Sequence, residues 1–296
     1  MGSTFFTHAR TFRRRAGLLG ARLGLHRLAT VGLQAGAALP AADPHQLRLL
    51  TLNLAHGRRR GTHQALVPRA RLERNLHHIG TAVRAIAPDV VALQEADGPS
   101  AWSGNFDHVA TLADLIQLQE FFRGEHNPLG RGRFNLASGT ALLSHHPLRD
   151  PVSQRFGLSW RDTKGFVVAT IAVPQWGGQE IDVASVHLDF LVRRVRRAQI
   201  RRLAETLAAR SRPLVVLGDL NCCFSREPYS MELLTRKLGL HAFQPDSHSP
   251  TFPAFRPRRR LDWILISPEL EFHGYGTLPA RISDHLLVMA DLALVG

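Results

Sequence analysis

From Gln46 onward, short apolar runs alternate with longer segments in which apolar residues recur at helical spacing. The short runs predict β-strands, because they are too short for helices and end at polar residues, Gly or Pro. They cover residues 47–53, 90–93, 139–144, 165–174, 180–190, 214–217, 260–267 and 285–294. The amphipathic segments predict helices over residues 69–87, 106–119 and 193–210. This mix predicts a strand-rich α/β domain, which can pack two sheets together with helices outside.

Side chains able to bind metal or phosphate stand at or near the ends of these predicted strands. They are Asn53, Glu95, His187, Asp219, Asn221, Asp262, Asp284 and His285. A strand fixes the direction of the side chain at its tip, so several tips of one sheet can converge on one cleft. Taken singly, such an aspartate is more often a turn or cap residue, and such a glutamate is more often solvated. The signal is therefore the whole set in this order.

The set has the chemistry needed to hydrolyse a phosphate ester. Glu95, together with oxygens from the other strand ends, could hold Mg²⁺, which would offset charge on a phosphoryl group. Asp219 could orient or deprotonate the attacking water. The histidines could donate hydrogen bonds to phosphoryl oxygens or protonate the leaving group, and Asp262 could orient His285.

The motifs around these residues resemble those of the endonuclease/exonuclease/phosphatase superfamily. In chain order they read LTLNLAHG, PDVVALQE, GTALLS, SVHL, PLVVLGDLN, RLDWILIS and SDHLLV. That superfamily contains deoxyribonuclease I, abasic-site endonucleases, neutral sphingomyelinases, inositol polyphosphate phosphatases and deadenylases. The resemblance covers roughly residues 47–294. It implies an α/β (α+β) fold, a four-layered sandwich of two packed, mostly antiparallel sheets flanked by helices. It also implies Mg²⁺-dependent phosphoester hydrolysis, with Mn²⁺ able to replace Mg²⁺.

The resemblance implies that Asn53 and Glu95 bind metal or metal-bound water and that Asp284 lies at the metal site. Two departures separate the chain from the abasic-site endonucleases. It reads LQEAD where they read LQETK, and NLAHG where they read N-x-N-G.

The resemblance also implies catalytic roles for His187, Asp219, Asn221, Asp262 and His285. His187 would contact the phosphate, Asp219 would position or activate the nucleophile with Asn221, and Asp262 would pair with His285. Abasic-site endonucleases carry a catalytic tyrosine at the position of His187. The histidine therefore favours the deoxyribonuclease I-like and neutral sphingomyelinase-like branch.

Five further residues are candidate substrate contacts: His56, Trp102, Asn105, Arg258 and Arg259. His56 belongs to the NLAHG motif. Trp102 and Asn105 lie in a distinctive stretch after the LQE motif, which forms either a substrate-side loop or a helix entry with Asn105 as the cap. Arg258 and Arg259 lie in FRPRRR, just before the strand of the RLDW motif.

The charge of the chain is unusual. It carries 37 Lys and Arg against 24 Asp and Glu, a formal net charge of +13, and only Lys164 and Lys237 are lysines. The excess favours a partner with phosphates or an anionic surface, or it reflects a compositional bias toward arginine. The adjacent Cys222 and Cys223 predict two free thiols that pack beneath a loop. No apolar run reaches the roughly 20 residues of a membrane span.

Residues 1–45 are a basic extension rich in Arg, Ala, Gly and Leu, and residues 46–296 are expected to form the catalytic domain. The extension is interpreted as a disordered segment, a leader or a membrane-surface segment. We expect a cytoplasmic monomer, or an exported or membrane-associated protein if residues 10–42 act as a leader.

The favoured hypothesis is a Mg²⁺-dependent phosphodiesterase of the nuclease type that acts on nucleic acid, because the motif set accompanies a basic charge balance. The alternative is the same core acting on a phospholipid, with peripheral membrane contact through residues 1–45, or on a small phosphate ester. A non-catalytic binding module is the third hypothesis, and the intact acidic and histidine set argues against it.

Overall fold

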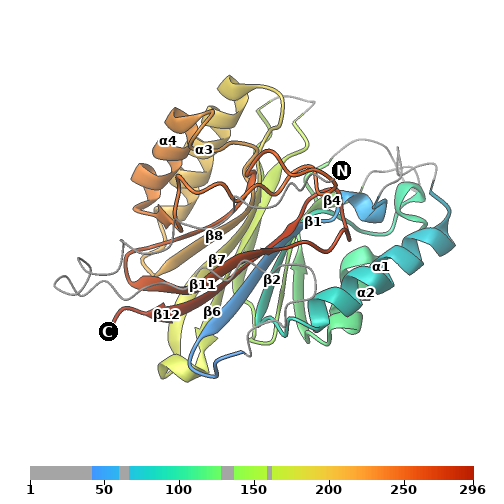
Figure 1. Ribbon diagram of the computed structural model, residues 1–296, viewed down its shortest axis with the longest axis horizontal. Helices are drawn as coiled ribbons and strands as arrows, with labels where there is room; N and C mark the ends of the chain where they lie inside the picture. The colour runs from blue at the N-terminus through green and yellow to red at the C-terminus, as the bar shows by residue number, and fades with distance from the viewer. Residues whose placement is uncertain (1–41, 60–66, 128–136, 159–161) are drawn as a thin grey trace, which may run out of the picture.

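A computed structural model describes residues 42–59, 67–127, 137–158 and 162–296. Within these residues, two six-stranded sheets pack face to face (Figure 1). The interpretation of the N-terminal extension concerns residues outside this description, apart from 42–45. No helix in the described part of the chain is long and apolar enough to cross a membrane.

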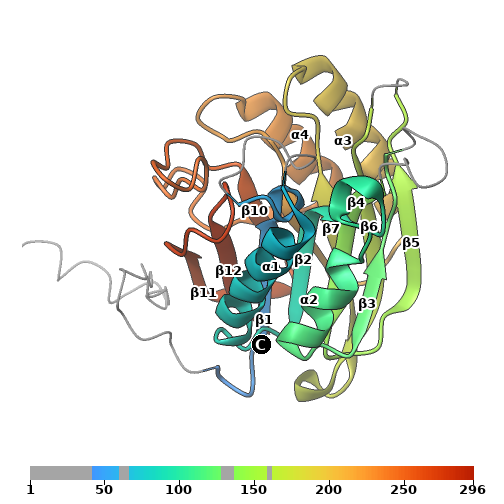
Figure 2. The same cartoon turned by 90° about the vertical axis from the view of Figure 1, so that its right-hand side faces the viewer.

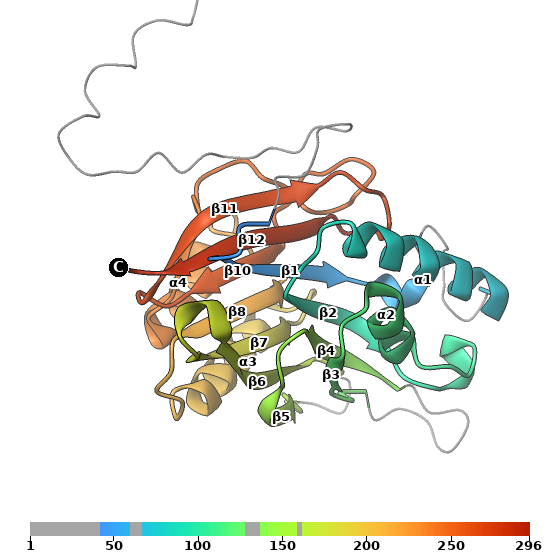
Figure 3. The same cartoon turned by 90° about the horizontal axis from the view of Figure 1, so that it is seen from below.

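The first sheet has the strand order β11-β12-β1-β2-β4-β3. Its strands are β1 (Leu47–Asn53), β2 (Val90–Asp97), β3 (Glu120–Arg123), β4 (Ser138–Ser144), β11 (Leu270–Leu278) and β12 (Leu287–Leu294). Neighbouring strands are antiparallel except for the parallel pair β1–β2. Figure 3 shows β11, β12, β1 and β2 side by side in this order.

The second sheet has the strand order β5-β6-β7-β8-β10-β9. Its strands are β5 (Arg149–Arg155), β6 (Gly165–Val173), β7 (Gln179–His187), β8 (Leu214–Asp219), β9 (His241–Ala242) and β10 (Asp262–Ile266). Its one parallel pair is β7–β8. The sheets are therefore mostly antiparallel, as predicted.

Helices cover the outer faces of both sheets. They are α1 (Arg69–Arg84), α2 (His108–Ile116), α3 (Arg193–Leu207) and α4 (Pro228–Leu238). One core lies between the sheets, a second joins the first sheet to α1 and α2, and a third joins the second sheet to α3 and α4. Figure 1 shows the two helix pairs on opposite sides of the molecule, and Figure 2 looks onto α1 and α2. The predicted four-layered sandwich is confirmed.

The strand register explains why the polar strand ends come together. His187 pairs with Asp219 across the parallel strands β7 and β8, and Asp219 pairs with Asp262 across β8 and β10. In the first sheet, Asn53 pairs with Gln94 across the parallel strands β1 and β2. Because parallel strands end at the same edge, each sheet presents its polar side chains at one edge.

Every predicted strand and helix is present, but four strands and one α-helix of the described residues were not predicted: β3, β5, β9, β11 and α4. The edge strand β5 is exposed and polar over most of its length, and β11 contains two glycines, so neither shows the expected apolar run. For α4 the signals existed, since Pro228 begins the helix and Gly239 ends it in a left-handed conformation. The helices also end earlier than predicted. For example, α2 stops at Ile116 because Gln117 adopts a left-handed conformation.

The two cysteines are free and lie in the core between the second sheet and the helices α3 and α4. Cys222 is 3% exposed and Cys223 is 6% exposed, and burial raises the pKa of the Cys222 thiol. We expect neither thiol to react with DTNB in the folded protein. Two thiols per chain should react after unfolding in guanidinium chloride. A rapidly labelled thiol in the folded state would contradict this packing.

Candidate active site

One cavity at the edge where the two sheets end collects most of the polar side chains that the sequence singled out. This central cavity has a volume of about 320 Å³. Seven of the eight predicted catalytic and metal-binding residues line it: Asn53, Glu95, His187, Asp219, Asn221, Asp284 and His285. The eighth, Asp262, is fully buried and contacts His285.

A β-bulge directs Glu95 into the central cavity. The register of β2 shifts between Gln94 and Ala96, so Glu95 is the extra residue, and its φ of 49° lies in the left-handed region. Gln94 and Ala96 are fully buried, whereas the Glu95 side chain is 20% exposed. Bulges and left-handed backbone of this kind are often kept where a functional side chain must point in one direction.

Asp219 stands at the centre of the cluster. Its Oδ2 accepts a 3.0 Å hydrogen bond from Nδ2 of Asn53, which links the two sheets. The same oxygen lies 3.5 Å from Nε2 of His187 and 3.7 Å from Nε2 of His285. Its Oδ1 accepts a 3.0 Å hydrogen bond from the backbone N–H of Asn221. The backbone N–H of Asn221 therefore holds Oδ1 in place, while Oδ2 faces both imidazoles.

Gly218 allows β7 and β8 to approach each other immediately before Asp219. A Cβ at this position would lie 2.0 Å from the carbonyl oxygen of Val186, and the φ of Gly218 is +145°. Only glycine fits this backbone without moving the strand. The glycine of the GDLN motif thus determines where Asp219 enters the cavity.

A buried carboxylate holds His285. Oδ2 of Asp262 lies 2.8 Å from Nδ1 of His285 and also accepts a hydrogen bond from the Thr251 hydroxyl. The Phe252 ring packs on the imidazole, with ring centroids 4.6 Å apart. This arrangement leaves Nε2 of His285 facing Asp219 in the central cavity.

Asp219, Asp262 and His285 form a buried group whose ligand atoms all lie within 4.8 Å of one another, so this group could bind a metal ion. Asp262, however, already uses its oxygens on Nδ1 of His285 and on Thr251. Mg²⁺ prefers oxygen ligands and retains several waters, which such a dry and hydrogen-bonded group does not favour. We therefore interpret the three side chains as a proton-handling group.

Burial and ion pairing set the protonation of the cluster. Burial raises the pKa of Asp219 to about 6. Burial disfavours the charged form of His285, but Asp262 and Asp219 outweigh this effect and raise its pKa to about 10. Burial and the nearby Lys164 ammonium hold the pKa of His187 well below its usual value. At neutral pH the cluster thus combines an ionised Asp219, a protonated His285 and a neutral His187.

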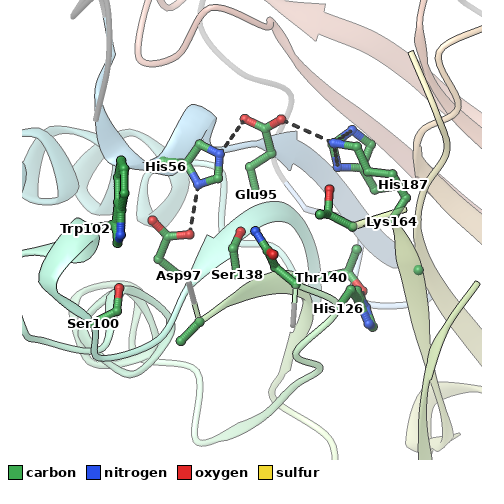
Figure 4. A pocket seen from close by; sticks show the side chains of 15 residues that line it. His56, Glu95, Asp97, Ser100, Trp102, His126, Ser138, Thr140, Lys164 and His187 are labelled. Atoms are coloured by element: carbon green, nitrogen blue, oxygen red, sulfur yellow. Dashed lines mark hydrogen bonds and ion pairs between the residues drawn. The ribbon is translucent and has the colours of Figure 1, made fainter. Parts of the chain in front are cut away.

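A second cavity of about 100 Å³ adjoins the central one across Glu95. Figure 4 shows Glu95 between His56 and Lys164. Nε2 of His56 lies 3.4 Å from Glu95, and Nδ1 lies 2.9 Å from Asp97. Burial works against a charged His56, but the two carboxylates raise its pKa. Burial alone would likewise raise the pKa of Glu95, but His56 and Lys164 hold it well below its usual range.

Lys164 and Arg58 are site residues that the sequence reasoning missed. Nζ of Lys164 lies 3.0 Å from Nε2 of His187 and 3.5 Å from Oε1 of Glu95. Nη2 of Arg58 lies 2.7 Å from Oδ2 of Asp284. Only two lysines occur in this arginine-rich chain, so the lysine in DTKG departs from the bias of the chain itself. The rarity of lysine could have pointed to Lys164 as a functional residue, because lysine and arginine are not interchangeable near a reacting group.

The structure brings only some of the five candidate substrate contacts to the central and second cavities. His56 and Trp102 line the second cavity, and Arg259 lines the central cavity. Arg258 lies outside both and lines a third cavity beyond Arg259. Asn105 is exposed and lines none of the three.

The alternative interpretation of Asn105 as a helix cap is wrong. Its φ is 59°, in the left-handed region, whereas a cap residue has extended backbone. Asp107 caps α2 instead, because its side chain accepts hydrogen bonds from the backbone N–H groups of Val109 and Ala110.

Glu95 and Asp284 supply the oxygen ligands that a hard divalent cation prefers. Both carboxylates line the central cavity, and their side chains are 20% and 29% exposed, so a hydrated cation could reach them. Oδ2 of Asp284 pairs with Arg58, which leaves Oδ1 as its oxygen for a cation. Asn53 is less suited, because its Oδ1 already accepts the N–H of Ala55 at 3.0 Å. The donor set therefore fits Mg²⁺ or Mn²⁺.

Comparison with known proteins agrees with this geometry. A sequence profile of the endonuclease/exonuclease/phosphatase family matches residues 50–285. The chain belongs to this family. The family consists of hydrolytic phosphoesterases, so its members share the chemistry that the cavity can support. No curated protein matches the chain by sequence.

Solved structures show the same fold. An endonuclease/exonuclease/phosphatase from Beutenbergia cavernae is 25% identical with a TM-score of 0.65, and the match covers 85% of this chain and 72% of that protein. The human Nocturnin catalytic domain with bound sulfate is 20% identical with a TM-score of 0.63, covering 86% and 96%. D. rerio TDP2 complexed with a single-strand DNA product is 14% identical with a TM-score of 0.62, covering 83% and 98%.

A buried histidine, His126, lines the wall of the second cavity. His126 is 1% exposed, and its Nε2 lies 2.9 Å from the Thr140 hydroxyl. Within the described part of the chain its Nδ1 has no hydrogen-bond partner. Burial lowers the pKa of His126 from 6.5 to about 4. Between these values the unfolded chain binds a proton that the folded chain does not.

We therefore expect the free energy of unfolding to decrease as the pH falls from 6.5 to about 4. The decrease caused by His126 amounts to roughly 3 kcal/mol and is complete near pH 4. Above pH 6.5 none of this stability is lost. Guanidinium unfolding between pH 7.5 and pH 4.5 tests this. His126→Gln should show a shallower decrease than the wild type, whereas His78→Gln, on the exposed side of α1, should not. Equal slopes for all three proteins would contradict the assignment.

Proposed function

We propose that this protein is a Mg²⁺-dependent phosphodiester hydrolase in which Mn²⁺ can replace Mg²⁺. The observation that carries the proposal is the placement of Asp219. This buried carboxylate faces one neutral and one protonated imidazole, in a cavity that Glu95 and Asp284 also line. A base, an acid and a pair of oxygen ligands therefore surround one space that a phosphodiester could occupy.

The side chains divide the proton transfers between them. Asp219 takes a proton from the attacking water as the new O–P bond forms, and Asn221 and Asn53 hold its carboxylate in place. His285 is kept cationic by Asp262 and gives its proton to the leaving oxygen as the ester bond breaks. Neutral His187 donates a hydrogen bond to a phosphoryl oxygen.

A divalent cation held by Glu95 and Asp284 would offset negative charge on the phosphoryl group. Burial and Lys164 keep His187 neutral, and Lys164 lines the same cavity. Together these residues concentrate positive charge where the transition state carries negative charge.

Nucleic acid is the substrate that we favour. Arg259 extends the positive charge along the rim of the central cavity, and the chain carries a net charge of +13. A protein of the same fold, D. rerio TDP2, has been solved with a single-strand DNA product. Phosphate contacts by arginine are the usual basis of sequence-independent nucleic-acid binding.

A substrate panel tests the proposal. Purified protein with Mg²⁺ should hydrolyse bis-p-nitrophenyl phosphate and cleave single-stranded DNA, RNA or plasmid. The same panel includes vesicles that contain sphingomyelin or phosphatidylcholine. Absence of turnover on every substrate would contradict the proposal and favour a non-catalytic binding module.

A second candidate function is hydrolysis of a phospholipid, and one surface feature favours it. Phe190, Leu191 and Val192 follow β7 in sequence and are 61%, 72% and 48% exposed, and Phe190 lines the central cavity. Exposed Arg193 and Arg194 come next. An apolar tip beside basic residues is typical of peripheral membrane contact. If lipid is the substrate, L191S/V192S should lower turnover of vesicle lipid and leave bis-p-nitrophenyl phosphate hydrolysis unchanged.

A further inference from the structure

A third cavity, of about 170 Å³, lies next to the central cavity, and Arg259 lines both. We call it the flanking cavity. Three loop segments and Trp263 line it: residues 223–226, residues 245–250 and residues 258–260. None of these segments takes part in the proton transfers proposed above. The flanking cavity is therefore distinct from the group of residues that transfers protons, and it lies next to the central cavity.

Its lining is strongly cationic. Arg226, Arg258 and Arg259 are exposed and line the cavity, and Asp246 is the acidic residue among its lining. Across the described residues, no carboxylate lies within ion-pair distance of these three guanidinium groups. Serine hydroxyls in the segments 223–226 and 245–250, such as that of Ser247, add hydrogen-bond donors. Uncompensated arginines around a polar hollow are suited to an anion with several oxygens.

Arg260 has a different role from the three exposed arginines. It is buried, and its guanidinium donates 2.9 Å hydrogen bonds to the carbonyl oxygens of Phe243 and Gln244. It also packs over the Trp263 ring, with Cζ 3.8 Å from the centroid. Arg260 therefore ties the segment before β10 to the loop that follows β9. The flanking cavity is held in shape before any ligand binds.

Arg259 connects the flanking cavity to the reaction centre. Its backbone carbonyl accepts hydrogen bonds from the N–H groups of Thr251 and Phe252, at 2.8 and 3.0 Å. Its guanidinium lies over the Phe252 ring, 5.0 Å from the centroid, and that ring packs on His285. An anion in the flanking cavity would thus lie on the far side of Arg259 from the phosphate that reacts near His285.

We propose that the flanking cavity binds a second phosphate group of the substrate. This phosphate is the neighbour, along the substrate's own backbone, of the phosphate that is cleaved. The substrate is then a nucleic-acid strand, whose phosphates repeat along one backbone, and Arg226 and Arg258 are its contacts in this cavity. These residues touch phosphate and no base, so they add affinity without sequence preference. The inference rests on the proposed hydrolysis of nucleic acid in the central cavity and adds a second phosphate-binding subsite beside it.

The test compares substrates with one phosphate and with many. The variant R226A/R258A removes both contacts, and R201A/R236A removes two exposed arginines from α3 and α4 as a matched control. Each protein is assayed with bis-p-nitrophenyl phosphate and with a labelled single-stranded DNA 12-mer, at several salt concentrations. Neither variant touches a residue of the central cavity.

We expect R226A/R258A to lower kcat/KM for the DNA by roughly 10- to 100-fold and to leave bis-p-nitrophenyl phosphate hydrolysis unchanged. Its DNA affinity should also depend less steeply on salt, by about 0.7 in the logarithmic slope for each lost contact. The control should match the wild type. Equal losses on both substrates, unchanged DNA cleavage, or wild-type protein that hydrolyses only the small diester would each overturn the inference. Failure of the wild type on both the small diester and the DNA would instead overturn the proposed hydrolysis itself.

Discussion

Asp219→Asn is expected to lower kcat by about 10³-fold or more and to leave the chain folded. Asparagine has the shape of aspartate and can still accept the backbone hydrogen bond from Asn221 through its oxygen, but it loses the hydrogen bond from Asn53, because its own NH2 group then faces that donor. It cannot take a proton from water, because an amide is not a base at neutral pH. Hydrolysis of bis-p-nitrophenyl phosphate at saturating Mg²⁺ measures the loss.

The melting temperature separates a catalytic from a structural role for Asp219. The substitution removes a carboxylate whose pKa burial raises to about 6, so we expect little loss of stability. Asp114→Asn, on the exposed side of α2, is the matched control and should retain full activity. A large fall in melting temperature, or a kcat near that of the wild type, would show that Asp219 does not act as the base.

Glu95→Gln is expected to weaken divalent-cation binding and to lower kcat by about 10²-fold or more. The amide keeps one oxygen but loses the charge, which His56 and Lys164 preserve in the wild type by holding the pKa of Glu95 low. Titration with Mn²⁺ followed by electron paramagnetic resonance measures binding directly, without reference to activity. The dissociation constant should rise by tenfold or more, on the order of 1.4 kcal/mol.

Two controls accompany the Glu95 experiment. Glu205→Gln, an exposed position on α3, should bind Mn²⁺ as the wild type does. Treatment of the wild type with EDTA should abolish hydrolysis, and added Mg²⁺ should restore it. Unchanged Mn²⁺ affinity in Glu95→Gln would remove Glu95 from the metal site, and activity that persists in EDTA would remove the metal from the mechanism.

The fold was largely predictable because most strands and helices are defined by local patterns. The run before Asp219 reads as a buried strand, and the spacing of Leu72, Leu76 and Ile79 defines α1. The elements that escaped prediction lack that local pattern. β5 lies at a sheet edge with its side chains mostly exposed, so hydrogen bonds to β6 form it without an apolar run.

The candidate site was predictable as a list of residues and not as an arrangement. Strand-end motifs singled out the side chains that line the central cavity. They did not indicate Lys164 or Arg58, which approach His187 and Asp284 only when segments distant in sequence pack together. The bulge at Glu95 was also hidden, since an extra residue in β2 is defined by the pairing with β4.

The order of apolar and polar residues predicted a strand-rich α/β domain, and the strand-end motifs carried the resemblance to the family and singled out the side chains that line the central cavity. Both were available because they depend on short local patterns of sequence. Protonation was decided only by the folded chain. The raised pKa of Asp219 and of His285, and the lowered pKa of His187, arise from burial and from charges brought within a few ångströms. Electrostatic energy depends on distance and solvent access through space, and neither quantity is encoded in sequence separation.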